Sequence, residues 1–235
     1  MKLDARAAMR EHRPSVYMVA FAFLLITFVL SMLSTRLQFP GMSISEIMSY
    51  SYDERLFEQL LYAAANRSGF ARLLDFAIEL MNVMLLGGFA LFCLRVSQRR
   101  PASVGTMFDI FGWFFRYLWL EIVTGVFIFL WSLLFVIPGI VAAYRYSMAK
   151  YVFFENPDMG ALECIQASKE MTMGHKGELF VMHLSMIGWI LLSAIPFVSI
   201  FTLPYMEITE ANYFRALSGQ LYAQPQGGDR DPWEQ

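Results

Sequence analysis

The sequence contains the uncharged stretch SVYMVAFAFLLITFVLSML at residues 15–33, and this stretch decides the class of the fold. A helix rises about 1.5 Å per residue, so the stretch reaches about 28 Å, close to the hydrocarbon thickness of a bilayer. Four positive side chains precede it: Lys2, Arg6, Arg10 and Arg13. Because positive charges favour the cytoplasmic side, we expect a first span with a cytoplasmic N-terminus, and we expect these four side chains to contact lipid headgroups. A cleaved signal peptide is the alternative, although the stretch exceeds the usual apolar region of about 7–15 residues.

The composition of the whole chain also indicates a membrane protein. Of its 235 residues, 57% are hydrophobic and 16% are charged, whereas soluble proteins average about 45–50% and about 25%. The formal net charge of −2 gives no overall basic field, so we do not expect nucleic acid as a partner. The two cysteines, Cys93 and Cys164, form no CxxC pair, so we expect unpaired thiols and neither a metal nor a cofactor.

Apolar runs elsewhere in the chain predict five further spans. We place them at residues 73–94, 118–137, 138–154, 179–195 and 197–217. Pro138 and Pro196 each follow an apolar run, and we place a turn at each because proline interrupts a helix. The segment 138–154 is at the lower limit of length for a span, and a re-entrant or interfacial segment is its alternative. The last segment carries Glu207 and Glu210, so five spans are the alternative to six.

Three segments have amphipathic patterns and are expected as interfacial helices on the cytoplasmic side: residues 2–13, 103–115 and 158–173. Ser103 and Asp158 are suitable N-caps for the second and third. The expected apolar face of the second consists of Val104, Met107, Phe108, Phe111, Phe114 and Phe115, and that of the third of Leu162, Ile165 and Met171. Each segment precedes a hairpin of spans. We therefore predict an all-α polytopic membrane protein with about six transmembrane helices as three hairpins, each preceded by an interfacial helix.

These spans define the expected domain organisation. Residues 1–217 would form one integral membrane domain, with an external loop at residues 34–72 and a disordered cytoplasmic tail at residues 218–235. An even number of spans returns the C-terminus to the cytoplasmic side, and Lys and Arg are concentrated in the segments assigned to that side. We expect a multi-pass protein of the cell membrane with both termini in the cytoplasm.

Polar side chains inside the apolar runs are the sharpest candidates for a functional site. Asp75, Glu79 and Asn82 follow the spacing i, i+4 and i+7, which places them on one stripe of the second span. An ionised group in a membrane is costly unless it is paired or hydrated. The stripe therefore predicts either a polar lining for an ion or substrate, or an ion pair with Arg145, which lies within the fourth expected span.

Two histidines are further candidates. His183 lies in the fifth expected span, where it could relay protons with Glu79 or Glu207, or donate an interhelical hydrogen bond. His175 and Lys176 lie in the cytoplasmic connection MGHKGE, where they could contact lipid phosphate. A plain helix-breaking linker is the alternative for that connection.

A set of short motifs in residues 131–217 points to one family. The motifs are IPGI at 137–140, YSMA at 146–149, NPD at 156–158, SK at 168–169, MGHK at 173–176, GW at 188–189 and PY at 204–205. The set resembles the uncharacterised bacterial integral membrane proteins grouped as domain-of-unknown-function family 975. The chain departs from the family's usual residues at Lys150 and Glu155. The resemblance implies a multi-pass protein of the bacterial cytoplasmic membrane, and it implies no activity.

The sequence carries no enzyme signature such as a P-loop, HExxH, GxSxG or GxGxxG motif, and we expect no enzymatic activity. The first hypothesis is a membrane scaffold or accessory subunit that binds lipid or a partner protein, including a second copy of the chain. The alternative is a small transporter or export component that uses the polar stripe of the second span. Replacement of Glu79 by Gln would abolish function under the second hypothesis and leave it unchanged under the first.

Overall fold

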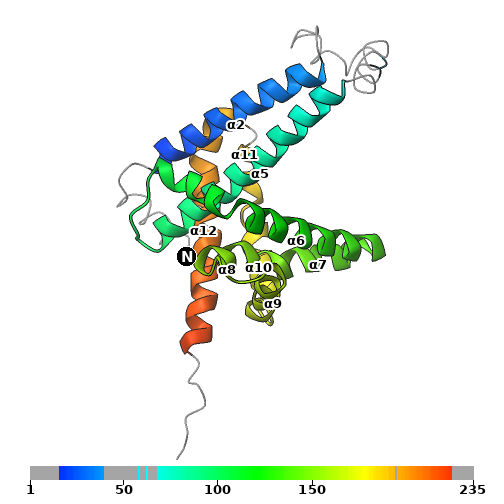
Figure 1. Cartoon of the computed structure of the whole chain (residues 1–235). Coiled ribbons are helices and arrows are strands. Elements are labelled where there is room, and N and C mark those ends of the chain that lie inside the picture. Colours follow the sequence, from blue (N-terminus) through cyan, green and yellow to red (C-terminus); the bar gives the residue numbers. More distant parts are fainter. Residues whose placement is uncertain (1–15, 40–57, 59–61, 63–67, 194, 224–235) are drawn as a thin grey trace, which may run out of the picture. The chain divides into compact units, whose positions relative to one another are not determined.

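The computed structural model describes residues 16–39, 58, 62, 68–193 and 195–223, and none of these residues forms a strand (Figure 1). The helices are α2 (Val16–Gln38), α5 (Gly69–Ser97), the 3₁₀ helix η2 (Val104–Trp113), α6 (Phe114–Leu134), α7 (Val136–Tyr146), α8 (Ala149–Glu155), α9 (Ala161–Met171), α10 (Lys176–Leu184), α11 (Ile187–Ser193) and α12 (Pro196–Ala223). The prediction of an all-α protein is confirmed for the described residues. The expected interfacial helix at 2–13, with its four basic side chains, and most of the loop at 34–72 lie outside them.

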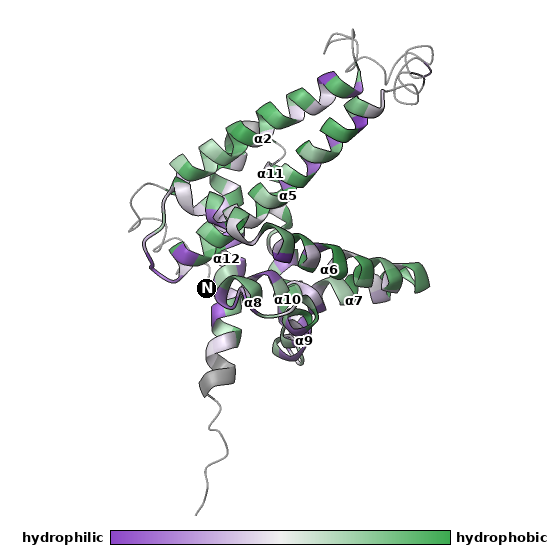
Figure 2. Cartoon of the chain, in the orientation of Figure 1, coloured by the Kyte–Doolittle hydropathy of each residue, from purple (hydrophilic) through white to green (hydrophobic). Residues whose placement is uncertain are grey.

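Three helical segments are long and apolar enough to cross a membrane: Val16–Gln38, Gly69–Ser97 and Val104–Leu134. They contain the first predicted span from residue 16 onward, the whole of the second, and most of the third. Hydrophobic residues run along α2 and α6 in Figure 2. The chain therefore has the helices of a membrane protein, while the arrangement of six spans remains a prediction.

The fourth and fifth predicted spans are each divided between two short helices. Residues 138–154 fall in α7 and α8, which are separated at Ser147 and Met148, and residues 179–195 fall in α10 and α11, which are separated at Ser185 and Met186. At both breaks a serine hydroxyl donates to a carbonyl three residues earlier, over 3.0 Å for Ser147 and 2.6 Å for Ser185. Such local bonds compete with the backbone hydrogen bonds of a helix. A hydropathy pattern does not detect them.

The helix break that we expected at Pro138 occurs at Phe135, three residues earlier. Phe135 is extended, with φ −161° and ψ 152°, and it separates α6 from α7. Pro138 is the third residue of α7, a position in the first turn where the missing N–H costs no helical bond. The sixth predicted span lies within α12, which continues through Pro204 to Ala223 and so passes the expected boundary of the tail at residue 217.

The two described interfacial segments differ from the predicted amphipathic helices. Residues 104–113 form a 3₁₀ helix that buries Thr106, Met107 and Ile110 and leaves Phe108 exposed. The third segment begins at α9 rather than at Asp158, because the Glu163 carboxylate accepts the Gly160 N–H over 2.9 Å and caps the helix there. Its buried face consists of Cys164, Ile165, Ser168 and Met171, whereas Leu162 is exposed. A 3₁₀ helix and a later start shift the faces that α-helical spacing predicts.

The chain divides into two compact units, and we describe each by itself: residues 21–86, and residues 1–20 with 87–235. In the first unit, α2 and the beginning of α5 are joined by polar side chains. Ser34 Oγ donates to Asp75 Oδ1 over 2.5 Å, and Gln38 Nε2 donates to both carboxylate oxygens over 3.3 Å. A carboxylate on one helix is thereby satisfied by two donors on the other.

The second unit is built on the end of α5, which packs closely against η2 and α6. Gly88 makes this approach possible, because a Cβ atom there would lie 1.9 Å from the Met107 carbonyl oxygen. Gly87 likewise faces the ring of Tyr117. Beyond them α6 and α7 form a hairpin that is close-packed at Gly139, where a Cβ atom would lie 2.1 Å from Ser132 Oγ (Figure 1). At Gly88 the absence of a side chain thus admits a neighbouring backbone.

Candidate functional site

The predicted polar stripe of α5 lies within the unit of residues 21–86, and its three members have different surroundings. Asp75 accepts the hydrogen bonds from Ser34 and Gln38, which sequence spacing within one helix could not reveal. Glu79 is exposed on the helix surface. Asn82 Oδ1 is buried, and no hydrogen-bond partner for it occurs among the described residues. The three members thus differ in their surroundings, since one is bonded, one exposed and one buried, and the predicted polar lining stays a prediction.

Arg145 and His183 belong to the other unit. The Nε atom of Arg145 is buried without a hydrogen-bond partner in the described part of the chain. The Arg145 carbonyl accepts bonds from Ser168 and Thr172 of the α9 segment, over 2.9 and 3.3 Å. The expected ion pair between Glu79 and Arg145 would join the two units and stays a prediction.

His183 makes an intrahelical bond and an aromatic contact. Its Nδ1 atom lies 2.9 Å from the Leu179 carbonyl of the preceding turn of α10. The centre of its ring lies 5.3 Å from that of Tyr144 on α7, in an edge-on arrangement. This geometry gives the ring a packing role between two helices, while the predicted proton relay and interhelical hydrogen bond stay untested.

Sequence reasoning missed an ionic cluster that joins α8 to α12. Lys150 Nζ lies 3.5 Å from Glu207 Oε2 and 3.4 Å from Glu210 Oε2. Tyr151 donates its hydroxyl hydrogen to Glu207 Oε2 over 3.3 Å. Each of the three charged side chains is a quarter exposed or less. The signal was present in the sequence, because Glu207 and Glu210 are spaced i, i+3 on an apolar helix, but nothing in the sequence identifies Lys150 as their partner.

A polar cavity of about 210 Å³ adjoins this cluster. Its polar lining comes from four helical segments and comprises Glu121, Thr124, Ser147, Lys150 and Glu210. Thr124 Oγ1 is buried and has no hydrogen-bond partner among the residues described. The cavity therefore combines carboxylates, an ammonium group and a hydroxyl oxygen, a set that can bind a small hydrated cation or exchange protons.

The second polar feature lies at the start of α10, next to the predicted lipid contacts His175 and Lys176. Gly174 adopts a φ of +86°, the left-handed conformation that glycine tolerates, and it turns the chain from α9 into α10. His175 Nδ1 lies 3.3 Å from Glu178 Oε1, and Tyr213 of α12 donates to Glu178 Oε2 over 3.1 Å. The MGHKGE connection thus carries a carboxylate that is held in place from α12.

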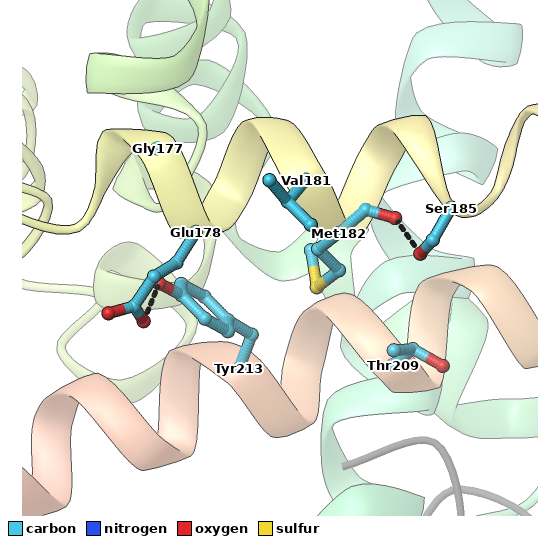
Figure 3. A pocket seen from close by; sticks show the side chains of 7 residues that line it. All are labelled: Gly177, Glu178, Val181, Met182, Ser185, Thr209 and Tyr213. Carbon is cyan, nitrogen blue, oxygen red and sulfur yellow. Dashed lines mark hydrogen bonds between the residues drawn. The ribbon is translucent and has the colours of Figure 1, made fainter.

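An open groove of about 500 Å³ extends from that carboxylate between α10 and α12 (Figure 3). Glu178 and Tyr213 lie at one end, Val181 and Met182 line the middle, and Ser185 and Thr209 lie at the other end. Ser185 and Thr209 donate their hydroxyl hydrogens to carbonyls of their own helices, over 2.6 and 2.7 Å. The groove is consequently apolar along its length and charged at one end.

Both cysteines are unpaired, as expected, and both are buried. Burial raises the pKa of the Cys164 thiol to about 11, so this thiol is protonated near neutral pH. Within the described ranges, no group of three or more His, Cys, Asp and Glu side chains is arranged to hold a metal ion.

Comparison with known protein families assigns the carboxy-terminal part of the chain. Residues 133–220 match the model of the family described as Protein of unknown function (DUF975). This region belongs to the DUF975 family. The resemblance seen in the sequence is thereby confirmed. The DUF975 region contains the Lys150 cluster and all the residues that line the groove. No curated protein and no solved structure matches the chain.

Proposed function

We propose that this protein is a multi-pass membrane protein that acts without catalysis, as a scaffold or accessory subunit that binds lipid. The observation that carries the proposal is its exposed apolar surface. Five consecutive residues at the turn between α6 and α7, residues 133–137, are each at least 61% exposed. Phe115 and Phe197 are about four fifths exposed, at 82% and 80%. Soluble monomers rarely leave such patches in water, so lipid is the solvent that fits them.

Charge pairing in the same unit supports this proposal. Arg95 lies 2.9 Å from Asp109, and Arg116 lies 2.6 Å from Asp158. These pairs occur in segments that flank the apolar hairpin of α6 and α7. The hairpin itself carries no charged residue from position 122 to position 144. A hairpin of this kind can enter hydrocarbon while the charged groups at its base stay in the headgroup region.

Native mass spectrometry of protein extracted gently from its own membrane tests the proposal. We expect species heavier than the 27.0 kDa chain, with increments that match phospholipids or a partner subunit. A chain that appears only at its own mass, under conditions that keep lipid on a known lipid-binding membrane protein, would contradict it.

A second candidate is a small transporter, and the polar cavity beside Lys150 favours it. Charged groups within apolar helices often mark ion pathways. Reconstituted protein would then dissipate an imposed proton or potassium gradient faster than protein-free liposomes. Glu210→Gln would abolish this flux, whereas Arg116→Ala, at an exposed pair, would not. Equal rates for wild-type and protein-free liposomes would rule out this candidate for these ions.

A further inference from the structure

We infer that the groove between α10 and α12 binds one phospholipid whose headgroup carries a primary ammonium, with the ammonium at Glu178 and an acyl chain along Val181 and Met182. The inference rests on the proposed lipid-binding function and adds the site and the class of headgroup. It assigns to the groove a ligand with one charged end and a long apolar body, because the groove has that same polarity.

The charged end supplies the acceptor for an ammonium group. Glu178 has a side chain that is 64% exposed, so an incoming ligand can reach it. A carboxylate has about four acceptor positions, and the bonds from Tyr213 and His175 leave others open. Tyr213 is itself buried and holds the carboxylate from the side of α12 (Figure 3). A primary ammonium can donate N–H bonds to this carboxylate, whereas a trimethylated choline group cannot.

The phosphate of such a headgroup lies two carbons from the ammonium and needs a cationic partner nearby. Lys176 is two residues before Glu178, in the first turn of α10. The backbone N–H groups at the start of this nine-residue helix add positive partial charge at the same place. Lys176 does not line the groove, and a side chain two positions away points to another side of the helix, so the phosphate would lie at the N–H groups of the helix start. The Glu178 carboxylate in the groove favours a headgroup with a positive end over a purely anionic one.

The body of the groove fits an acyl chain. From Glu178 to Ser185 the groove follows α10 for about 10 Å. The Ser185 and Thr209 hydroxyl groups at its far end already donate hydrogen bonds to backbone carbonyls, so they need no polar partner from a ligand. Val181 is 61% exposed, and its neighbours Phe180 and Leu184 are 49% and 52% exposed. An acyl chain in the groove would thus continue onto an apolar surface already suited to lipid.

The test uses the full chain in nanodiscs that contain equal amounts of phosphatidylethanolamine, phosphatidylglycerol and phosphatidylcholine, with retained lipid identified by native mass spectrometry. We expect one phosphatidylethanolamine retained with about a fivefold preference over each of the others, since the charge contact is partly exposed. Glu178→Gln should reduce this preference to about one. The matched control, Glu170→Gln, makes the same change on an exposed face of α9 and should retain it.

A second pair of variants tests the acyl-chain part. Met182→Trp fills the middle of the groove and should remove the retained lipid, whereas Leu162→Trp enlarges an exposed side chain of α9 that does not line the groove and should not. Retention without headgroup preference, or a preference that survives Glu178→Gln, would overturn the inference and leave the general lipid-binding function standing. Retention of no lipid by the wild-type chain would overturn both. A mass of two chains that Met182→Trp abolishes would assign the groove to a second copy and also overturn the inference.

Discussion

At the scale of single residues, the most consequential contact is the one between Lys150 and the two carboxylates of α12. Removal of one partner from a largely buried ion pair leaves the other charge unpaired, which destabilises a fold more than the pair itself stabilises it. Because these side chains are up to a quarter exposed, we expect Lys150→Met to lower the free energy of unfolding by about 2–3 kcal/mol. The measurement is thermal or denaturant unfolding of the purified protein in detergent.

The control for this prediction neutralises the partners as well. The triple variant Lys150→Met, Glu207→Gln, Glu210→Gln leaves no unpaired charge and should recover most of the lost stability. Arg116→Ala removes an exposed pair and should change stability by less than about 1 kcal/mol. A triple variant that is less stable than Lys150→Met would show that the carboxylates have a structural role beyond this pair.

At the scale of helices, Gly88 is the position at which α5 depends on the absence of a side chain. Gly88→Ala places a methyl group against the backbone of Met107, and overpacking of this kind costs about 1–3 kcal/mol. Gly125→Ala is the matched control, because no atom lies within 4 Å of a Cβ atom there. Alanine also favours a helix interior over glycine by about 1 kcal/mol. We therefore expect the melting temperature to fall for the first variant and to stay or rise for the second, and equal rises for both would contradict the packing of η2 on α5.

The same scale shows what the sequence could predict and what it could not. Long apolar runs predicted α2 and α5 well, because length and hydropathy are properties of the chain itself. The breaks within residues 138–154 and 179–195 coincide with serine hydroxyls that bond to nearby carbonyls, and hydropathy registers neither the breaks nor the bonds. The candidate sites depend on pairings between distant segments. Lys150 lies 57 residues from Glu207, and no periodicity links them.

At the scale of the whole molecule, the number of membrane crossings decides on which side the chain ends. An odd number of spans would leave the two termini on opposite sides, and an even number would leave them on the same side. Within the second unit, the cavity beside Lys150 bears on this question, because Glu121 near the start of α6 and Lys150 after α7 line it together. We therefore predict that the chain after α7 returns to about the depth of Glu121 in α6, so that the hairpin adds no net crossing.

This return predicts that the segment after α5 and the segment after α8 lie on the same side of the membrane. With the basic residues Arg95, Arg99 and Arg100 at the end of α5, that side should be the cytoplasm. Fusions of a fluorescent protein that matures only in the cytoplasm, placed after residue 100, after residue 158 and after residue 235, should all fluoresce. Alkaline phosphatase, which is active only outside, should be inactive at these three positions and active when inserted in the loop at residues 40–57. Activity after residue 158 would mean that α6 crosses the membrane without α7 returning, and activity after residue 235 alone would place the last crossing in α12.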